Sequence, residues 1–549
     1  MTMLRRLLSR TASTGFAALA LVLALLPDLS WAAVVAAAAA LAIAWRGHRD
    51  LGPGRARFDR GVAVAAIAVV AAQSTGGSPI PAAIAAGALI TVVGLEPQLA
   101  VAVATGHMAS ANLETGRGRG WFTPRAIGDL VNVAVALFAA AAAATMLWAS
   151  PVPLWLAVIA VIGVLGTAAV GAAAALLRRR RSAHTGDAAV IRAVGALDPV
   201  FVVHFSGPPG SAYQLRMWLP YLDLLGDPYV VISREAGHLG ELRSATTAPI
   251  VVAPSMSEVE QLLAPGVKAA FYVNGSALNT HLVRFGNLRH LQLFHGESDK
   301  ASSFNKVTTI YDEVFVAGQA AVDRYRAHGL DLTFRKVGRP QLAAVASGPR
   351  AGSGARPVLL YAPTWTGLTS EFDYSSLPIG KAVVSEALRR DMDVIVRAHP
   401  YTRFNLAASR QLDSIERLLA EDAERTGRAH RWGPRSTGDF SLVDCINAAD
   451  VAVCDISGVA TDWIASDRPF AVTDMGMLGD RFADEAWIAR GAYRLAGDAG
   501  NLGSVFDELL DTDSKAVQRK ETREYFLGGA NGESGVEAFL AAARDAYRG

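Results

Sequence analysis

The 549-residue sequence has only two cysteines, Cys445 and Cys454, and nothing lies near them at metal-ligand spacing. So few cysteines exclude a disulfide-stapled secreted scaffold, and both are expected to be reduced core thiols. The formal net charge of +2 is too small for a nucleic-acid-binding protein. The sequence also has no Walker A loop and no Gly-x-Gly-x-x-Gly between a strand and a helix, which excludes the common ATPase and dehydrogenase classes.

Charged residues are scarce in the first third of the chain. Gly61 to Leu95 and Leu130 to Leu177 contain none, and Thr11 to Trp45 contains only Asp28. Crossing a bilayer takes about 20 residues, and proline or glycine interrupts each of these runs. The pattern therefore predicts an α-helical transmembrane domain over residues 1–182, with about six spans in three hairpins, and a linker over 183–198.

Basic residues flank the predicted spans on one side only. They precede the first span, fill alternate loops and follow the sixth, whereas the other three loops contain no lysine or arginine. The positive-inside rule places such loops in the cytoplasm. We therefore expect a multi-pass protein of the cell (inner or plasma) membrane, with both termini and the later domains cytoplasmic. A cleaved signal peptide is the alternative for the first span.

From Pro199 onward, short apolar strands alternate with amphipathic helices, which predicts parallel sheets covered on both faces. A linker-like segment rich in glycine, Ser347 to Arg356, divides the alternation in two. The pattern predicts two Rossmann-like doubly wound domains, 199–346 and 347–549, with a cleft between them. The predicted strands are Val200–Phe205, Tyr229–Ser233, Ile250–Ala253, Ala269–Val273, Leu291–Phe294, Val314–Val316, Val358–Tyr361, Val394–Arg397, Val451–Cys454 and Phe470–Thr473.

Polar residues follow four of these strands, at the end where open α/β sheets bind ligands. The clusters are His295–Lys300, Ala362–Trp365, Arg397–Pro400 and Asp455–Asp462. Ser457 and Gly458 open a helix whose free N–H groups suit a phosphate, although Ser457 is also a good N-cap. Asp462 is placed to accept hydrogen bonds from a polyol hydroxyl, or else is a solvated helix carboxylate.

His295 is the best candidate for a general base, because Glu297, Asp299 and Lys300 follow it closely and can orient its ring and tune its pKa. A structural histidine is the alternative. Arg397 and His399 are candidates for neutralising a pyrophosphate leaving group, against an ordinary pair at a strand end.

Two Asp-x-Asp sequences raise the question of a metal. Asp391-Met392-Asp393 precedes a predicted strand, and Asp511-Thr512-Asp513 lies between helices. Neither position faces the predicted cleft, so both are expected to be surface turns. We therefore predict no essential metal and no cofactor.

At these clusters the chain resembles the CDP-glycerol glycerophosphotransferase family, the teichoic-acid primases and polymerases. The matching motifs are His295-Gly296 with Lys300, Pro363-Thr364-Trp365, Arg397-Ala398-His399, and Ser457-Gly458 with Asp462. The resemblance implies a GT-B fold, catalytic roles for His295 and His399, and donor contacts. The implied donor-binding residues are Gly296, Glu297, Ser298, Lys300, Arg339, Pro363, Thr364, Arg397, Asp455, Ser457, Gly458 and Asp462.

Four features depart from the family pattern, one of which is the pair Glu297 and Asp299 in the His295-Gly296 loop, where the family is less acidic. Gly458 replaces a second serine, Thr366 replaces an arginine, and Gly338-Arg339-Pro340 stands where the family has Gly-x-Pro-Arg. These departures leave the donor open.

The resemblance implies a transferase that moves glycerol phosphate from CDP-glycerol to a cell-envelope glycopolymer and releases CMP. The predicted spans would bind this transferase to the membrane and hold its active site against the bilayer, which favours a lipid-linked acceptor. One alternative is a GT-B transferase that uses CDP-ribitol or a nucleotide sugar. A second is a membrane transporter with a nucleotide-sensing domain, although few polar residues lie inside the predicted spans, where a transport path needs them.

Overall fold

The structure is a computed structural model, and the described residues form two compact units. One unit comprises Met1–Met108 and Glu114–Ala189, and the other comprises Ala109–Leu113 and Val190–Gly549. The described residues are 16–24, 26, 29–46, 53–74, 84, 86–87, 89–91, 93–94, 108–114, 124–148, 159, 163, 166, 186–300, 305–350, 356–366, 373–438, 440–528 and 533–548. Part of the predicted linker, residues 351–355, lies outside them.

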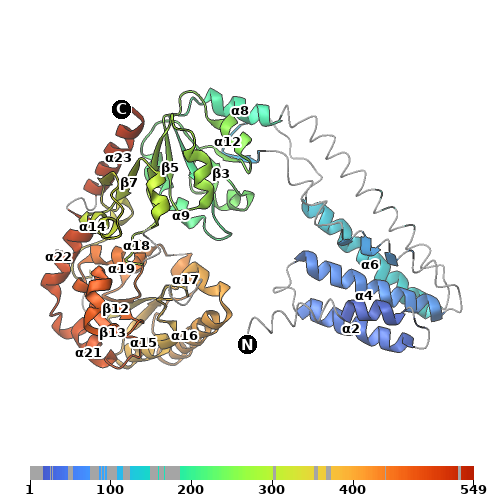
Figure 1. The fold of residues 1–549 in the computed structure, drawn as a ribbon. Helices are drawn as coiled ribbons and strands as arrows, with labels where there is room; N and C mark the ends of the chain where they lie inside the picture. The colour runs from blue at the N-terminus through green and yellow to red at the C-terminus, as the bar shows by residue number, and fades with distance from the viewer. Residues whose placement is uncertain are drawn as a thin grey trace. The chain divides into compact units, whose positions relative to one another are not determined.

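The first unit contains three long helices, α2 (Ser30–Arg46), α4 (Pro53–Ser74) and α6 (Pro124–Trp148), and α4 packs against both of the others (Figure 1). Its core consists mainly of alanine, as at the fully buried Ala37, Ala66 and Ala134. Small side chains let helix backbones approach closely. Some large apolar side chains stay exposed, among them Trp31, Leu147 and Trp148.

The structure overturns the predicted transmembrane domain. Among the described residues, no helix is both long and apolar enough to cross a lipid bilayer. α2 has only 17 residues, and α4 has four charged residues among its first eight. The prediction of six spans in a multi-pass membrane protein with cytoplasmic termini is therefore wrong. The stretches 95–107 and 167–185, which it also used, lie outside the described residues.

The second unit contains two sheets, the first of which has eight strands in the order β1-β4-β3-β2-β5-β6-β7-β8. All neighbours in it are parallel except the edge strand β1, which pairs antiparallel with β4. The strands are β1 (Ser110–Ala111), β2 (Phe201–Phe205), β3 (Tyr229–Ser233), β4 (Ile250–Val252), β5 (Ala269–Tyr272), β6 (Arg289–Gln292), β7 (Glu313–Val316) and β8 (Phe334–Lys336). The chain returns past β2 to add β5, so the switch point lies between β2 and β5.

The second sheet has five parallel strands in the order β10-β9-β11-β12-β13, with its switch point between β9 and β11. Its strands are β9 (Val358–Ala362), β10 (Asp393–Val396), β11 (Val451–Cys454), β12 (Phe470–Asp474) and β13 (Tyr493–Ala496). Alternate residues enter the cores on opposite faces, with Leu359 and Tyr361 on one and Leu360 and Ala362 on the other. Burial on both faces explains the continuous apolar runs in the sequence.

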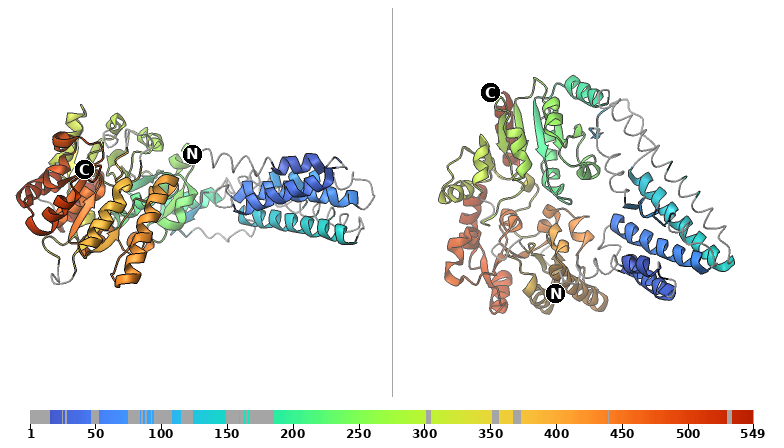
Figure 2. Two further views of the ribbon diagram at one scale, coloured as in Figure 1. Left: turned by 90° about the horizontal axis from the view of Figure 1, so that it is seen from below. Right: turned by 45° about the vertical axis from the view of Figure 1, so that its right-hand side comes forward.

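Helices cover both sheets (Figure 2). Around the first sheet they are α8 (Gly186–Ala196), α9 (Tyr213–Arg216), α10 (Leu219–Asp223), α11 (Leu239–Leu242), α12 (Met256–Leu262), α13 (Thr280–Val283) and α14 (Gln319–Ala327). The later ones are α15 (Leu377–Arg389), α16 (Leu406–Thr426), α17 (Pro434–Thr437), α18 (Leu442–Ala448), α19 (Gly458–Trp463), α20 (Phe482–Glu485), α21 (Leu502–Asp507), α22 (Ala516–Leu527) and α23 (Glu533–Arg548).

The chain ends by returning to the first sheet. Phe539, Ala543 and Tyr547 of α23 are buried in the core that contains Phe201 and Phe271 (Figure 1). The stacked rings of Phe201 and Tyr547 lie 5.1 Å apart. The last helix therefore ties the two sheet domains together, a connection that strand and helix patterns do not reveal.

Candidate active site

One cavity of about 1090 Å³ lies between the two sheets, at the carboxyl ends of their strands. The loops after β6, β9, β10 and β11 all reach it. A Cβ atom added to Gly458 would lie only 3.9 Å from Gly296 Cα, so the two domains approach closely there. The lining residues include every predicted site residue except Asp455, namely His295, Gly296, Glu297, Ser298, Lys300, Arg339, Pro363, Thr364, Arg397, His399, Ser457, Gly458 and Asp462.

His295 has the hydrogen bonding of a base. Its Nδ1 lies 3.2 Å from the carbonyl oxygen of Val273, which can only accept, so Nδ1 carries the proton. The free lone pair is then on Nε2. Burial lowers the pKa of His295 to about 4, so the ring is neutral at pH 7.

His399 has the opposite tautomer. Its Nδ1 accepts a hydrogen bond of 3.1 Å from the Tyr401 N–H, which leaves the proton on Nε2. Burial, with the nearby Lys300 charge, lowers the pKa of His399 to about 3. The site therefore holds two neutral histidines with different roles, one able to take a proton and one able to donate a hydrogen bond.

Tyr213, from α9, stands edge-on to both histidine rings. Its ring centroid lies 5.9 Å from that of His295 and 6.3 Å from that of His399. No motif marks this tyrosine in the sequence. Its signal in the sequence is its position, just after the Gly- and Pro-rich turn Ser206–Ser211 that follows the carboxyl end of β2.

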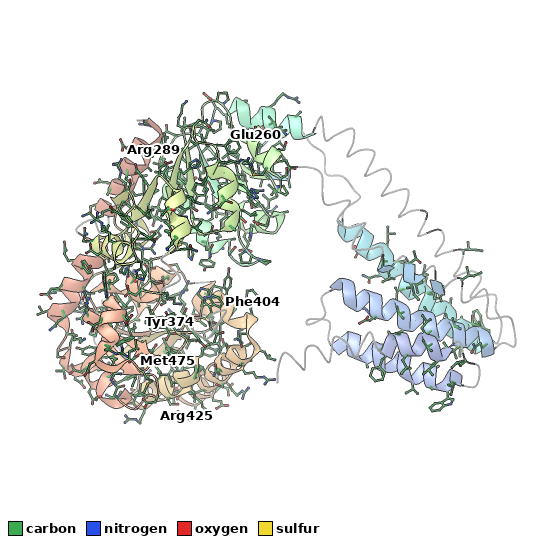
Figure 3. All side chains as sticks on the ribbon, in the orientation of Figure 1. Glu260, Arg289, Tyr374, Phe404, Arg425 and Met475 are labelled. Atoms are coloured by element: carbon green, nitrogen blue, oxygen red, sulfur yellow. The ribbon has the colours of Figure 1, made fainter. Side chains whose placement is uncertain are left out.

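Lys300 lines the cavity and is held by Thr364, whose Oγ1 accepts a hydrogen bond of 2.8 Å from Nζ. The ammonium also lies 5.5 Å from the ring centroid of Tyr374, which Figure 3 labels in the second domain. Burial lowers the pKa of Lys300 to about 8, although Asp455 and Asp373 oppose the shift. Lys300 is therefore a cation at neutral pH that loses its charge in mildly alkaline solution.

This pKa predicts an alkaline limit for donor use. The cationic form exists below about pH 8, so kcat/KM for an anionic donor should fall as the pH rises through 8. In Lys300→Arg the guanidinium stays charged throughout, and the alkaline limb should move by two or more pH units. Steady-state rates from pH 5 to pH 10 measure this. Identical alkaline limbs in both proteins would contradict the assignment.

Asp455 does not line the cavity but bonds to Thr364, which does. Its Oδ2 accepts hydrogen bonds from the N–H groups of Thr364 (2.6 Å) and Ser376 (3.1 Å), and its Oδ1 accepts one of 2.6 Å from Thr473 Oγ1. Burial raises the pKa of this carboxyl. Asp455 thus fixes the Pro363-Thr364 turn that contacts Lys300.

Arg397 and Ser457 present polar groups to the cavity. Arg397 Nη1 donates to the carbonyl oxygens of Ser436 and Phe440, so the contacts that orient it are main-chain carbonyls. Ser457 does not cap α19 through its side chain, and its buried Oγ has no hydrogen-bond partner in the described part of the chain. Both groups therefore suit an anionic ligand with acceptor oxygens.

Glu297 and Asp299 use their carboxylates to anchor the His295 loop. Glu297 Oε1 accepts a 2.6 Å hydrogen bond from the Ala317 N–H, and its Oε2 lies 3.7 Å from Arg324 Nη2. Asp299 pairs with Arg324 and accepts the Ile488 N–H at 2.8 Å. Neither carboxylate contacts the His295 ring, so burial alone accounts for most of the shift in the pKa of His295.

Arg339 and Asp462 neutralise each other at the edge of the cavity. Arg339 Nη2 donates to Asp462 Oδ1 at 2.9 Å and to Oδ2 at 3.2 Å, and Nε donates to Oδ1 at 3.1 Å. The two side chains are 5% and 6% exposed, and Arg339 lies in the first domain whereas Asp462 lies on α19. This buried pair links the two domains.

Breaking this pair should destabilise the fold. Asp462→Asn leaves a buried guanidinium without its counter-charge, which typically costs about 3–5 kcal/mol. The double variant Arg339→Met/Asp462→Leu removes both charges and should recover most of that loss. Urea unfolding followed by tryptophan fluorescence measures both, since Trp463 is buried beside Asp462. A loss below about 1 kcal/mol in Asp462→Asn would show that the pair contributes little.

Each of the two Asp-x-Asp sequences has an aspartate that pairs with arginine. Asp391, just before β10, pairs with Arg356 and Arg428, and Asp513 pairs with Arg519. Within the described ranges, no three His, Cys, Asp or Glu side chains are grouped so as to hold a metal ion.

Comparison with known proteins identifies part of the chain. Residues 348–476 match the family model described as CDP-glycerol:poly(glycerophosphate) glycerophosphotransferase, whereas no curated protein matches the chain. This segment contains the Pro363-Thr364, Arg397–His399 and Ser457–Asp462 clusters.

Two similar solved structures are remote in sequence. A candidate UDP-N-acetylglucosamine 2-epimerase from Listeria monocytogenes has 14% identity and a TM-score of 0.44, covering 64% of this chain and 97% of its own. The wall teichoic acid polymerase TagF has 14% identity and a TM-score of 0.42, covering 68% of this chain and 95% of its own. At these TM-scores the likenesses support no conclusion about this chain. Residues 348–476 are similar to the CDP-glycerol glycerophosphotransferase family.

Proposed function

We propose that this enzyme transfers glycerol phosphate from CDP-glycerol to a hydroxyl group of a cell-envelope polymer and releases CMP. The observation that carries the proposal is the convergence of three groups in one cavity: a histidine with a free Nε2 lone pair, a hydrogen-bond-donating histidine and a lysine cation. At about 1090 Å³ the cavity is at the upper end of the usual range for ligand sites, which gives room for donor and acceptor together.

The proposed reaction is an in-line displacement at the phosphorus that bears glycerol. The acceptor oxygen forms a bond to that phosphorus while its proton passes to His295 Nε2, and the bond from phosphorus to the CMP oxygen breaks. Lys300, Arg397 and the Nε2–H of His399 stabilise the negative charge that develops on the phosphates. The proton on His295 then leaves to solvent. These three protein groups supply the charge compensation, so we propose that the transfer needs no metal, and activity should persist in EDTA.

The acceptor is proposed to approach along a row of aromatic rings. From His399 the row continues to Trp365 and Tyr401, whose centroids lie 6.1 and 5.2 Å from it, and Tyr401 is followed by Phe404 at 5.5 Å. Phe404 is 64% exposed and lies at the edge of the second domain toward the first (Figure 3). Apolar ring faces suit the C–H surfaces of a polyol or sugar terminus.

This path predicts a change confined to the acceptor. Phe404→Ser should raise the acceptor KM about tenfold and leave the donor KM near its normal value, because the ring lies outside the cavity that holds the donor. Val517→Ser is the matched control, since Val517 is 66% exposed on α22. Equal acceptor KM values in the two variants would remove Phe404 from the path.

Product analysis tests the proposal against its alternatives. The enzyme, CDP-glycerol labelled in the glycerol and a glycerol phosphate polymer should yield CMP and labelled polymer in equal amounts. Labelled polymer only from CDP-ribitol would change the donor but keep the chemistry. Release of a nucleoside diphosphate from a nucleotide sugar would show glycosyl transfer and reject phosphotransfer.

A further inference from the structure

Phe294, the residue directly before His295, has a left-handed backbone. Its φ angle is +47°, which a bulky aromatic residue rarely adopts because Cβ crowds the following carbonyl group. Strained backbone of this kind persists only where the surroundings enforce it, and it concentrates at functional sites.

Two buried side chains enforce the conformation of Phe294. Gln292 Oε1 accepts a 3.0 Å hydrogen bond from the Phe294 N–H, and Trp218 Nε1 donates one of 2.5 Å to the Phe294 carbonyl oxygen. Gln292 is itself fixed, since its Nε2 donates to the Asn274 carbonyl oxygen at 2.9 Å. The N–H and the carbonyl oxygen of Phe294 are therefore both held by side chains rather than by a neighbouring strand.

The hydrogen bonds that Gln292 and Trp218 make with Phe294, called the clamp below, determine where the His295 ring lies. The pairing of this strand with β5 ends where the Leu293 N–H donates to the Tyr272 carbonyl oxygen at 2.7 Å. The turn at Phe294 then redirects the chain, and the His295 ring reaches the carbonyl oxygen of Val273, the residue after Tyr272. That contact is the one that places the proton on Nδ1 and leaves Nε2 free.

We propose that Gln292 and Trp218 are positioning residues, which hold Phe294 in its left-handed conformation and thereby fix the ring orientation and tautomer of His295. Neither residue needs to touch the reacting atoms for this role. The inference rests on the proposed function for its kinetic consequence but not for its structural one.

The kinetic test uses a second-site rescue. Gln292→Leu should lower kcat about 100-fold with less than threefold change in donor KM. Adding Phe294→Gly to it should restore kcat to within about tenfold of wild type, because glycine adopts positive φ without strain. Gln214→Leu is the matched control, since Gln214 bonds to Asn274 in the same buried network but does not contact Phe294. Any loss that it causes should not be rescued by Phe294→Gly.

An independent readout needs no turnover. In full-length protein labelled with 15N-histidine, His295 should show a protonated Nδ1 and a pKa near 4. Gln292→Leu should give mixed tautomers and a still lower pKa, because the hydrogen bond to Val273, which raises the pKa, is weakened while the ring stays buried. The double variant should return both toward wild type, and Gln292→Glu, which keeps the accepting oxygen, should change them less than Gln292→Leu. Thermal unfolding identifies any variant that fails to fold.

These results separate the two ideas. Wild-type protein that transfers no glycerol phosphate, but shows the expected changes at His295, would reject the proposed function and keep the clamp. Active wild type in which Gln292→Leu changes neither kcat nor the His295 resonances would overturn the clamp, and so would a double variant no better than Gln292→Leu alone.

Discussion

His295→Gln should lower kcat for glycerol phosphate transfer about 1000-fold, which is within the usual contribution of a general base. Glutamine keeps an N–H that can donate to the Val273 carbonyl oxygen, so the loop should hold its conformation, but it has no basic lone pair in place of Nε2. Donor binding should change little, because the phosphate contacts come from other residues. Single-turnover release of CMP, with a direct measurement of donor affinity, separates the two effects.

The pH dependence and a control variant sharpen this result. In wild type, kcat/KM should fall on the acid side near pH 4, where His295 gains a proton and can no longer accept one. An acid limb near pH 6.5 would mean that a solvated histidine is the base. His328→Gln, a change of the same kind at an exposed histidine in the first domain, should leave transfer intact. Retention of more than a tenth of the activity in His295→Gln would reject the proposed base.

His399→Phe should cost about 100- to 1000-fold in kcat, the loss that typically follows removal of one hydrogen-bond donor from a developing anion. Phenylalanine keeps the ring contacts to Trp365 and Tyr401 but removes the Nε2–H. His399→Gln, which retains an N–H donor, should lose less than His399→Phe. Comparing kcat for the two variants measures the donor rather than the ring. A smaller loss in His399→Phe than in His399→Gln would show that His399 acts by packing alone.

The sequence predicted the bounds of a strand correctly where both faces of that strand are buried. Tyr229–Ser233 and Val451–Cys454 have the predicted bounds, because both faces of these strands are covered and the apolar run is continuous. β8 and β13 escaped prediction, since Arg335 and Lys336 in one and Arg494 in the other interrupt the run. The transmembrane prediction failed for a related reason. Hydropathy records that a run is apolar, but not where the helices within that run begin and end.

The site was predictable as a set of strand ends but not as a set of contacts. Parallel strands bring their carboxyl ends to one edge, so the loops after β6, β9, β10 and β11 had to meet if the sheets faced each other. Which way each carboxylate points depends on partners distant in sequence. Asp455 bonds to Ser376 and Thr473, and Asp462 pairs with Arg339, 123 residues away. No local pattern contains that information.

The central claim is that His295 and His399 act on a single donor phosphate from the two domains. A structure of the His295→Gln variant with CDP-glycerol tests it most directly. We expect the phosphate that bears glycerol to lie within hydrogen-bond distance of His399 Nε2 and Lys300 Nζ, with its far face open toward position 295. A diphosphate bound beyond reach of both groups, or outside the cavity between the sheets, would contradict the mechanism.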